Sequence, residues 1–294
     1  MRLRVTHNTT YRYSESASTS HHEARLTPRA SENQSTLAHE IVITPEPTVR
    51  RARLDFFGNK TTYFGLTEPH QKLEIEARSL VDNTLRRDVE CENSPAWESV
   101  RGRLATDRQR DTLQAYTMTF ESTHVTFCDA LFDFAASAFA PSEPLLCVAS
   151  ALMHKIHQEF KYDPTATDIH TSIDALLEKR RGVCQDFAHV FAGCLRSRGL
   201  AVRYVSGYLL THPPPGKPRL VGADASHAWV SVWVPEQGWI DFDPTNDLIP
   251  GEQHVTLAYG RDFGDVTPVR GVILGGGNHT VSVAVDVEPL DPVE

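Results

Sequence analysis

A cysteine near the start of an amphipathic segment is the residue best suited to nucleophilic chemistry in this sequence. After Cys184, apolar residues recur at the spacing of a helix, and Gly199 lies where a helix commonly ends. Cys184 would then occupy the first turn, where unpaired backbone N–H groups and the positive end of the helix dipole favour a thiolate. Cys194 falls in the apolar middle of the same helix, and we expect it to be buried and unreactive.

Two segments further along the chain could supply a base and a carboxylate. Alternation along the strand that begins at Ser226 presents His227 on one face, and a hairpin would bring Asp241 and Asp243 beside it. A thiol, an imidazole and a carboxylate are the parts of a nucleophilic site, in which the histidine takes the thiol proton and the carboxylate orients the ring. The same three residue types also occur by chance as buried structural side chains, and the pattern does not choose between the two aspartates.

The sequence around these positions resembles the bacterial transglutaminase-like family of papain-like cysteine enzymes. The resemblance spans a little under half of the chain and rests on FKYD from Phe160, GVCQDFAH from Gly182, RYVSGYL from Arg203, SHAWVSVWVP from Ser226, GWIDFDPTN from Gly238 and GRDFGDVTPVRGV from Gly260. It implies that Cys184 is the nucleophile, His227 the general base and Asp243 the orienting acid, because the family's acid directly precedes Pro-Thr. Asp241 is then a surface carboxylate or a supporting neighbour.

Three further residues are candidates for stabilising an oxyanion or binding substrate. The backbone N–H of Cys184 is the natural first oxyanion donor. The resemblance implies a second donor from the segment before the nucleophile, and Tyr162 could supply it or could simply pack. Gln185 belongs to the family's nucleophile motif and could hold the helix start or line the cleft. Trp229 could line a narrow channel that admits an amide side chain, or it could belong to the hydrophobic core.

The elements that would position these residues predict an α+β protein. A helix carrying the cysteine packs on an antiparallel sheet carrying the histidine and the aspartate, as in a papain-like or transglutaminase-like core. We expect a β-rich, sandwich-like N-terminal domain at 1–90, a connecting segment at 91–140 that is a linker or irregular up to about Leu113, and a catalytic core at 141–260 that includes a helix capped by Ser142. Alternating valines in 261–294 indicate a C-terminal strand segment that packs back on the protein.

The composition excludes several classes of function. Of 294 residues, 29 are Lys or Arg and 38 are Asp or Glu, giving a net charge of −9 without a concentrated basic face, which argues against nucleic-acid binding. No stretch is long and apolar enough to cross a membrane, and we expect a cytoplasmic protein.

Five cysteines without a CxxC pair suit neither a disulfide scaffold nor a structural zinc site, so we expect reduced thiols and no metal or cofactor. The adjacent His21 and His22 are expected at the surface.

We interpret the chain as an enzyme that forms a thioester at Cys184 from a peptide or protein amide and passes the acyl group to water or to another amine. We expect hydrolysis, as in a peptidase or amidase, rather than cross-linking, because neither a calcium-site pattern nor an activation segment is evident. Protein-glutamine transglutaminase activity is the alternative within this chemistry. A catalytically silent protein-binding module is the alternative of another class. The sequence does not indicate the natural substrate or the oligomeric state.

Overall fold

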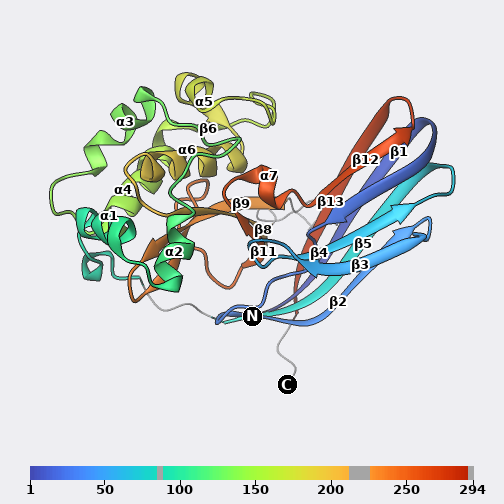
Figure 1. The fold of residues 1–294 in the computed structure, drawn as a ribbon, viewed down its shortest axis with the longest axis horizontal. Coiled ribbons are helices and arrows are strands. Elements are labelled where there is room, and N and C mark those ends of the chain that lie inside the picture. The colour runs from blue at the N-terminus through green and yellow to red at the C-terminus, as the bar shows by residue number, and fades with distance from the viewer. Residues whose placement is uncertain (85–88, 212–225, 291–294) are drawn as a thin grey trace, which may run out of the picture.

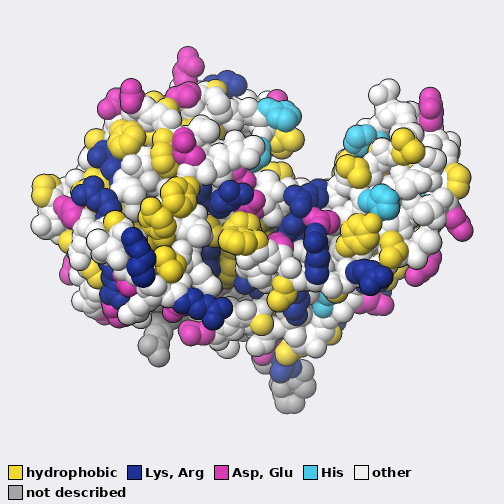
Figure 2. All heavy atoms as spheres, in the orientation of Figure 1, with side chains coloured by type: hydrophobic (Ala, Val, Ile, Leu, Met, Phe, Trp, Pro, Cys, Tyr) yellow, Lys and Arg dark blue, Asp and Glu magenta, His cyan; other side chains and the backbone are white. Residues whose placement is uncertain are grey.

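The computed structural model describes residues 1–84, 89–211 and 226–290, and it has the predicted mixed α+β fold. Helices α1 to α6 gather at one end of the molecule, a large sheet forms the other end, and a smaller sheet lies between them (Figure 1). Figure 2 shows that the outline is notched between the helical end and the tip of the large sheet, and that charges of both signs are interspersed on this face. Within the described ranges, no helix has the length and apolar character needed to span a bilayer.

One long strand, β1 (Arg2–Ala24), organises the larger sheet. Its first half pairs with β5 and β13, its second half pairs with β4 and β12, and β2 and β3 extend the sheet at its outer edges. All of these pairings are antiparallel, and the strands are β2 (Gln34–Thr44), β3 (Val49–Leu54), β4 (Lys60–Leu66), β5 (His70–Asn83), β12 (Val269–Gly275) and β13 (His279–Leu290). The two ends of the described chain therefore lie side by side in one sheet.

The two halves of this sheet share a hydrophobic core. The pairing of β1 with β5 shifts register between Arg12 and Ala17, and beyond that point β1 pairs with β4 and β12 instead. Ile43 of β2 and Ile75 of β5 pack in the same buried cluster as Phe64 of β4. The sheet is thus curled into the sandwich-like arrangement predicted for the N-terminal region, and β12 and β13 from the far end of the chain complete it.

The connecting segment predicted at 91–140 contains helices, including α1 and the start of α2 within the part predicted to be irregular. These are η1 (Cys91–Asn93), α1 (Trp97–Thr106), α2 (Arg110–Tyr116), α3 (Asp129–Ala135) and η2 (Ala136–Ala138). In α1 the buried residues Trp97, Val100 and Leu104 have helical spacing, and charged residues separate them. Because charged residues dominate this segment, its short apolar stripe did not indicate a helix, and the prediction of an irregular connection was wrong for α1.

The remaining helices pack around the smaller sheet. Its strands run antiparallel in the order β10 (Gly238–Phe242), β9 (Ser226–Val234), β8 (Val202–Leu209) and β11 (His254–Gly260). The other elements are α4 (Leu145–Glu159), β6 (Lys161–Tyr162), α5 (Ile173–Lys179), β7 (Arg181–Gly182), α6 (Cys184–Arg196) and α7 (Phe263–Val266). Phe191 of α6 and Val230 of β9 lie in one buried core, so the cysteine helix packs on the histidine strand as predicted.

Helix α4 begins at Leu145 and its N-cap is Pro144, two residues later than Ser142, the predicted cap. Ser142 has a left-handed backbone conformation with φ 65° instead of the extended conformation typical of an N-cap. The N–H groups at the start of α4 are satisfied by the connecting segment instead, because Pro95 accepts from Leu145 at 2.9 Å and the hydroxyl of Ser94 accepts from Leu146 at 3.0 Å.

Candidate active site

The first turn of α6 is held in place by a buried carboxylate. Oδ2 of Asp186 accepts a hydrogen bond from the backbone N–H of Val183 at 2.8 Å and another from the hydroxyl of Thr167 at 2.7 Å. The carboxylate comes so close to Gly182 that a Cβ there would lie 2.4 Å from Oδ2, which only glycine avoids. These contacts fix the chain entering the helix, whose first residue is Cys184.

His227 connects the thiol to a carboxylate. It lies on β9, near enough to Cys184 that this thiol raises the pKa of the imidazole. Nε2 of His227 lies 2.7 Å from Oδ2 of Asp243, which directly follows β10. Cys184 is partly exposed, whereas the imidazole is 10% exposed and the carboxylate is completely buried. The structure thus brings together three residues that are far apart in the sequence.

The carboxylate of Asp243 receives five hydrogen bonds. Oδ2 accepts from Nε2 of His227, from the side chain of Asn246 at 2.8 Å and from Nε2 of His254 at 3.2 Å. Oδ1 accepts from the backbone N–H groups of Thr245 and Asn246 at 3.0 and 3.2 Å. Burial raises the pKa of Asp243, but the hydrogen bonds from the two histidines outweigh it and hold the pKa well below its usual range. The group is a buried carboxylate anion at neutral pH.

The imidazole of His227 is held in its protonated form. Burial lowers the pKa of His227, but the hydrogen bond with Asp243 and the nearby negative charges of Asp243 and Cys184 outweigh burial and raise the pKa to about 10. At neutral pH an imidazolium therefore lies between the sulfur and the buried carboxylate. In this arrangement the histidine can donate a proton to the leaving group of a substrate bound at the thiol.

His254 is a member of this group that sequence reasoning missed. It lies on β11, which is separated from β9 by β8, and its ring packs edge-on against Trp229 with centroids 5.2 Å apart. Burial lowers the pKa of His254 by more than Asp243 raises it, so the ring is neutral and donates through Nε2. Its sequence position gives no signal, because the contact with Asp243 depends on the order of strands in the sheet.

The same three side chains have the spacing of a possible metal site. The ligating atoms of His227, Asp243 and His254 lie within 4.8 Å of one another. However, both Nε2 atoms donate to the carboxylate, whose two oxygens are already engaged by five donors. The arrangement is therefore explained as a hydrogen-bond network around the carboxylate of Asp243 that fixes the orientation of His227.

Of the other candidates, two lie next to the thiol. Tyr162 is 53% exposed on β6, which pairs in parallel with β7 immediately before the cysteine. Burial and the negative charge of Cys184 raise the pKa of Tyr162, so its hydroxyl stays protonated. Gln185 follows Cys184 in the helix and is partly exposed. Both side chains are accessible to a molecule bound at the thiol.

Trp229 and Asp241 form a buried pair behind the site. Trp229 is completely buried, so it packs in the interior and does not wall an open channel. Its indole N–H donates to Oδ2 of Asp241 at 3.2 Å, and the hydroxyl of Ser231 donates to the other oxygen. Asp241 is 2% exposed, which corrects the expectation of a surface carboxylate and leaves the supporting role.

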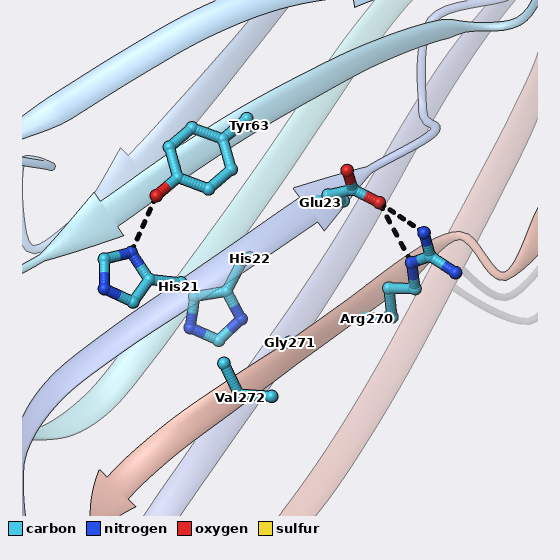
Figure 3. Close-up of a pocket in the computed structure, with 7 residues that line it drawn as sticks. All are labelled: His21, His22, Glu23, Tyr63, Arg270, Gly271 and Val272. Carbon is cyan, nitrogen blue, oxygen red and sulfur yellow. Dashed lines mark hydrogen bonds and ion pairs between the residues drawn. The ribbon is translucent and has the colours of Figure 1, made fainter. Parts of the chain in front are cut away.

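A separate pocket of about 350 Å³ lies on the large sheet, and none of the residues around Cys184 lines it. Figure 3 shows the hydroxyl of Tyr63 bonded to His21 and the carboxylate of Glu23 paired with Arg270 across β4, β1 and β12. His21 is exposed as expected, but His22 is buried, because neighbouring residues of a strand face opposite sides of the sheet.

Comparison with known proteins covers both parts of the chain. Residues 3–82 match the bacterial transglutaminase-like N-terminal region, and residues 133–244 match the transglutaminase-like superfamily. An uncharacterized protein of Mycobacterium tuberculosis is 41% identical over 303 residues, covering 99% of this chain and 93% of that protein. A protein-glutamine gamma-glutamyltransferase of Pseudomonas aeruginosa is 38% identical over 114 residues, which are 38% of this chain and 17% of that protein.

The whole fold has a counterpart among solved structures. The crystal structure of a candidate cysteine protease from Cytophaga hutchinsonii aligns with a TM-score of 0.76 at 22% identity, covering 100% of this chain and 92% of that one. The superfamily match contains Cys184, His227 and Asp243, the residues that meet around the buried carboxylate. Sequence and fold agree that the chain belongs to the transglutaminase-like superfamily of papain-like cysteine enzymes and carries the N-terminal region found in its bacterial members.

Proposed function

We propose that the protein is an acyl-transfer enzyme that acts on amide bonds of peptides or proteins through a thioester at Cys184. One observation carries the proposal: the imidazole of His227 is hydrogen-bonded to the buried carboxylate of Asp243, and the partly exposed thiol of Cys184 raises the pKa of the same imidazole. An imidazolium with a pKa of about 10 is the partner that an attacking thiolate needs.

In the first half of the reaction the sulfur attacks the amide carbon. The carbonyl oxygen becomes an oxyanion, which the backbone N–H of Cys184 and the hydroxyl of Tyr162 would stabilise. His227 then donates its proton to the departing amine nitrogen, the C–N bond breaks, and the thioester remains. Asp243 keeps the ring in position throughout, because His254 and Asn246 hold its carboxylate from other directions.

In the second half an acceptor attacks the thioester. His227, now neutral, takes a proton from the acceptor, the C–S bond breaks, and Cys184 regains its thiolate beside the imidazolium. We propose water as the acceptor, which makes the protein a peptidase or amidase. An amine acceptor, giving transglutaminase activity, is the second candidate, and the local identity to the gamma-glutamyltransferase of Pseudomonas aeruginosa supports it. The complete set of contacts among Cys184, His227 and Asp243 argues against a silent binding module.

The test is an activity screen with a library of peptides and γ-glutamyl amides, with and without an added primary amine. Hydrolysis releases a carboxylic acid in both arms, whereas transfer yields the amine adduct only when the amine is present, and mass spectrometry distinguishes the products. Cys184→Ala should be folded and inactive in both arms. Equal turnover by the wild-type protein and Cys184→Ala, or the absence of any acyl-enzyme at Cys184 during turnover, would refute the proposal.

A further inference from the structure

Two cysteines outside the candidate active site lie in contact. The Sγ atoms of Cys91 and Cys147 are 2.6 Å apart although the residues are 56 positions apart in the sequence. Cys91 begins η1 and Cys147 lies in the first turn of α4, and both are partly exposed. A disulfide bond is about 2.05 Å long, so a small movement would join the two sulfurs.

Backbone contacts that do not involve the thiols hold these two segments together. The hydroxyl of Ser94 donates to the carbonyl oxygen of Cys91 at 2.8 Å and accepts from the backbone N–H of Leu146 at 3.0 Å. One side chain therefore ties the residue carrying the first sulfur to the residue next to the second. The sulfurs are preorganised for a bond, which lowers the entropy cost of forming it.

We propose that Cys91 and Cys147 form a reversible disulfide when the protein meets a disulfide oxidant such as oxidised glutathione. The sulfur of Cys91 attacks one sulfur of glutathione disulfide, and the first glutathione leaves as a thiol with the proton of Cys91. Cys147 then attacks the Cys91 sulfur of the mixed disulfide, and a second glutathione leaves with the proton of Cys147. Two protein thiols are oxidised and one glutathione disulfide is reduced to two glutathione thiols.

The surroundings of the two sulfurs set this order of attack. Burial and the neighbouring thiol raise the pKa of Cys147 to about 12, so this thiol stays protonated and donates its hydrogen to the sulfur of Cys91. The Cys91 sulfur is the acceptor in this contact and is the one to react first. Cys194 is completely buried, with a pKa raised to about 12 by burial, and it has no access to an oxidant.

The bond would close a loop that contains α1, α2 and α3, and would tie its ends at the start of α4. The opposite part of α4 supports the turn after Asp243, because Nδ1 of His157 bonds to the carbonyl oxygen of Thr245 at 2.9 Å and His154 pairs with Asp247. The disulfide would therefore fix the base of a helix that braces the active-site turn. Neither sulfur contacts Cys184 or His227, so the Cys91–Cys147 bond should stabilise the fold without altering the contact between His227 and Asp243.

The experiment compares full-length protein equilibrated with glutathione disulfide or with dithiothreitol. Cys128 and Cys147 share one tryptic peptide, so the linkage is assigned by non-reducing peptide mapping in Cys128→Ser, which keeps the proposed pair. We expect a peptide containing Cys91 joined to the one containing Cys147, two hydrogens lighter than the sum of the reduced peptides. The thermal midpoint should rise by about 5–10 °C on oxidation in the wild type and in Cys128→Ser, and not in Cys91→Ser.

Two results would overturn the proposal. One is that Cys91 and Cys147 remain as free thiols, or end only as separate glutathione adducts, at a ratio of oxidised to reduced glutathione that oxidises ordinary protein dithiols. The other is that Cys91→Ser shows the same oxidant-dependent rise in thermal midpoint as the wild type. Reduction with dithiothreitol must restore both thiols for the bond to count as reversible.

Discussion

Nε2 of His254 lies 3.2 Å from Oδ2 of Asp243, the oxygen that also accepts from His227. The two histidines come from strands that are not neighbours in the sheet, yet they meet on one buried oxygen. One ring is charged and faces the thiol, and the other is neutral and faces the interior. His254 thus holds the same carboxylate oxygen that orients His227.

Removal of the His254 side chain should slow turnover without destroying the candidate active site. In His254→Ala, Asp243 loses one donor, and a hydrogen bond to a charged group contributes about 1.5–3 kcal/mol, so we expect kcat to fall by about 10- to 100-fold with little change in KM. His254→Gln keeps a donor and should recover part of the loss. Steady-state kinetics and thermal unfolding measured on both variants separate this effect from a loss of folded protein. Unchanged kcat in folded His254→Ala would exclude a positioning role.

The two aspartates of β10 and the turn after it should behave differently. Asp243→Asn removes the negative partner of His227 but leaves the ring buried, so the pKa of His227 should fall from about 10 to near or below its ordinary value. The imidazolium would then be lost at neutral pH, and turnover should fall far more than in Asp241→Asn, which affects Trp229 and Ser231. NMR titration of His227 and kcat measurements test both expectations. A larger kcat loss in Asp241→Asn would show that the wrong carboxylate was chosen.

The same pKa sets the pH range in which His227 stabilises the fold. Because the folded-state pKa is raised above that of an unfolded histidine, the stabilisation is complete below about pH 6.5 and is lost as the pH rises through about 10. The difference in unfolding free energy between the wild type and His227→Gln should therefore narrow across that range. Urea unfolding of both proteins at a series of pH values measures it. A difference that widens with pH would contradict the assigned protonation state.

Cys184 should be the most reactive thiol at mildly acidic pH. Iodoacetamide at about pH 6 attacks thiolates, and the pKa values of Cys194 and Cys147 are raised to about 12. We expect peptide mapping to find the label first at Cys184 in the wild type and much later in His227→Gln. Equal labelling rates in these two proteins would remove the basis for an activated nucleophile.

Gly182 should be intolerant of even a methyl group. In Gly182→Ala the new Cβ would lie 2.4 Å from Oδ2 of Asp186, displacing the carboxylate that caps α6. Loss of a helix cap costs about 1–2 kcal/mol, and labelling of Cys184 should slow because its turn is displaced. Gly102→Ala in α1 is the matched control, since a Cβ there meets nothing within 4 Å and alanine favours a helix. Urea unfolding should show destabilisation only at position 182.

The sequence predicted those parts of the site that depend on local pattern. Cys184 begins a helix and His227 lies on a strand, because apolar spacing and alternation specify both elements. The choice of Asp243 over Asp241 came from the Pro-Thr that follows it, and the structure gives that aspartate the contact with His227. Patterns of this kind also predicted the β-rich N-terminal region and a helix followed by strands, whereas the transglutaminase-like core was predicted from the family resemblance.

The features that sequence reasoning missed depend on contacts between distant segments. His254 reaches Asp243 only because β11 pairs with β8, and alternation within a strand does not reveal which strands become neighbours. Likewise, Cys91 meets Cys147 because Ser94 joins the connecting segment to α4, which no spacing rule contains. The burial of His22 and Asp241 arises in the same way, from the faces that other elements cover.

Strand β1 also governs the order in which the molecule can assemble on the ribosome. β1 is synthesised before the catalytic part, but its partners β12 and β13 emerge after it, so one edge of β1 stays unpaired during translation. The helices and the smaller sheet are enclosed between the first and last strands of a single sheet. Cutting the chain at the end of β5 would therefore not free an enzyme, but would leave two strands without the template on which they dock.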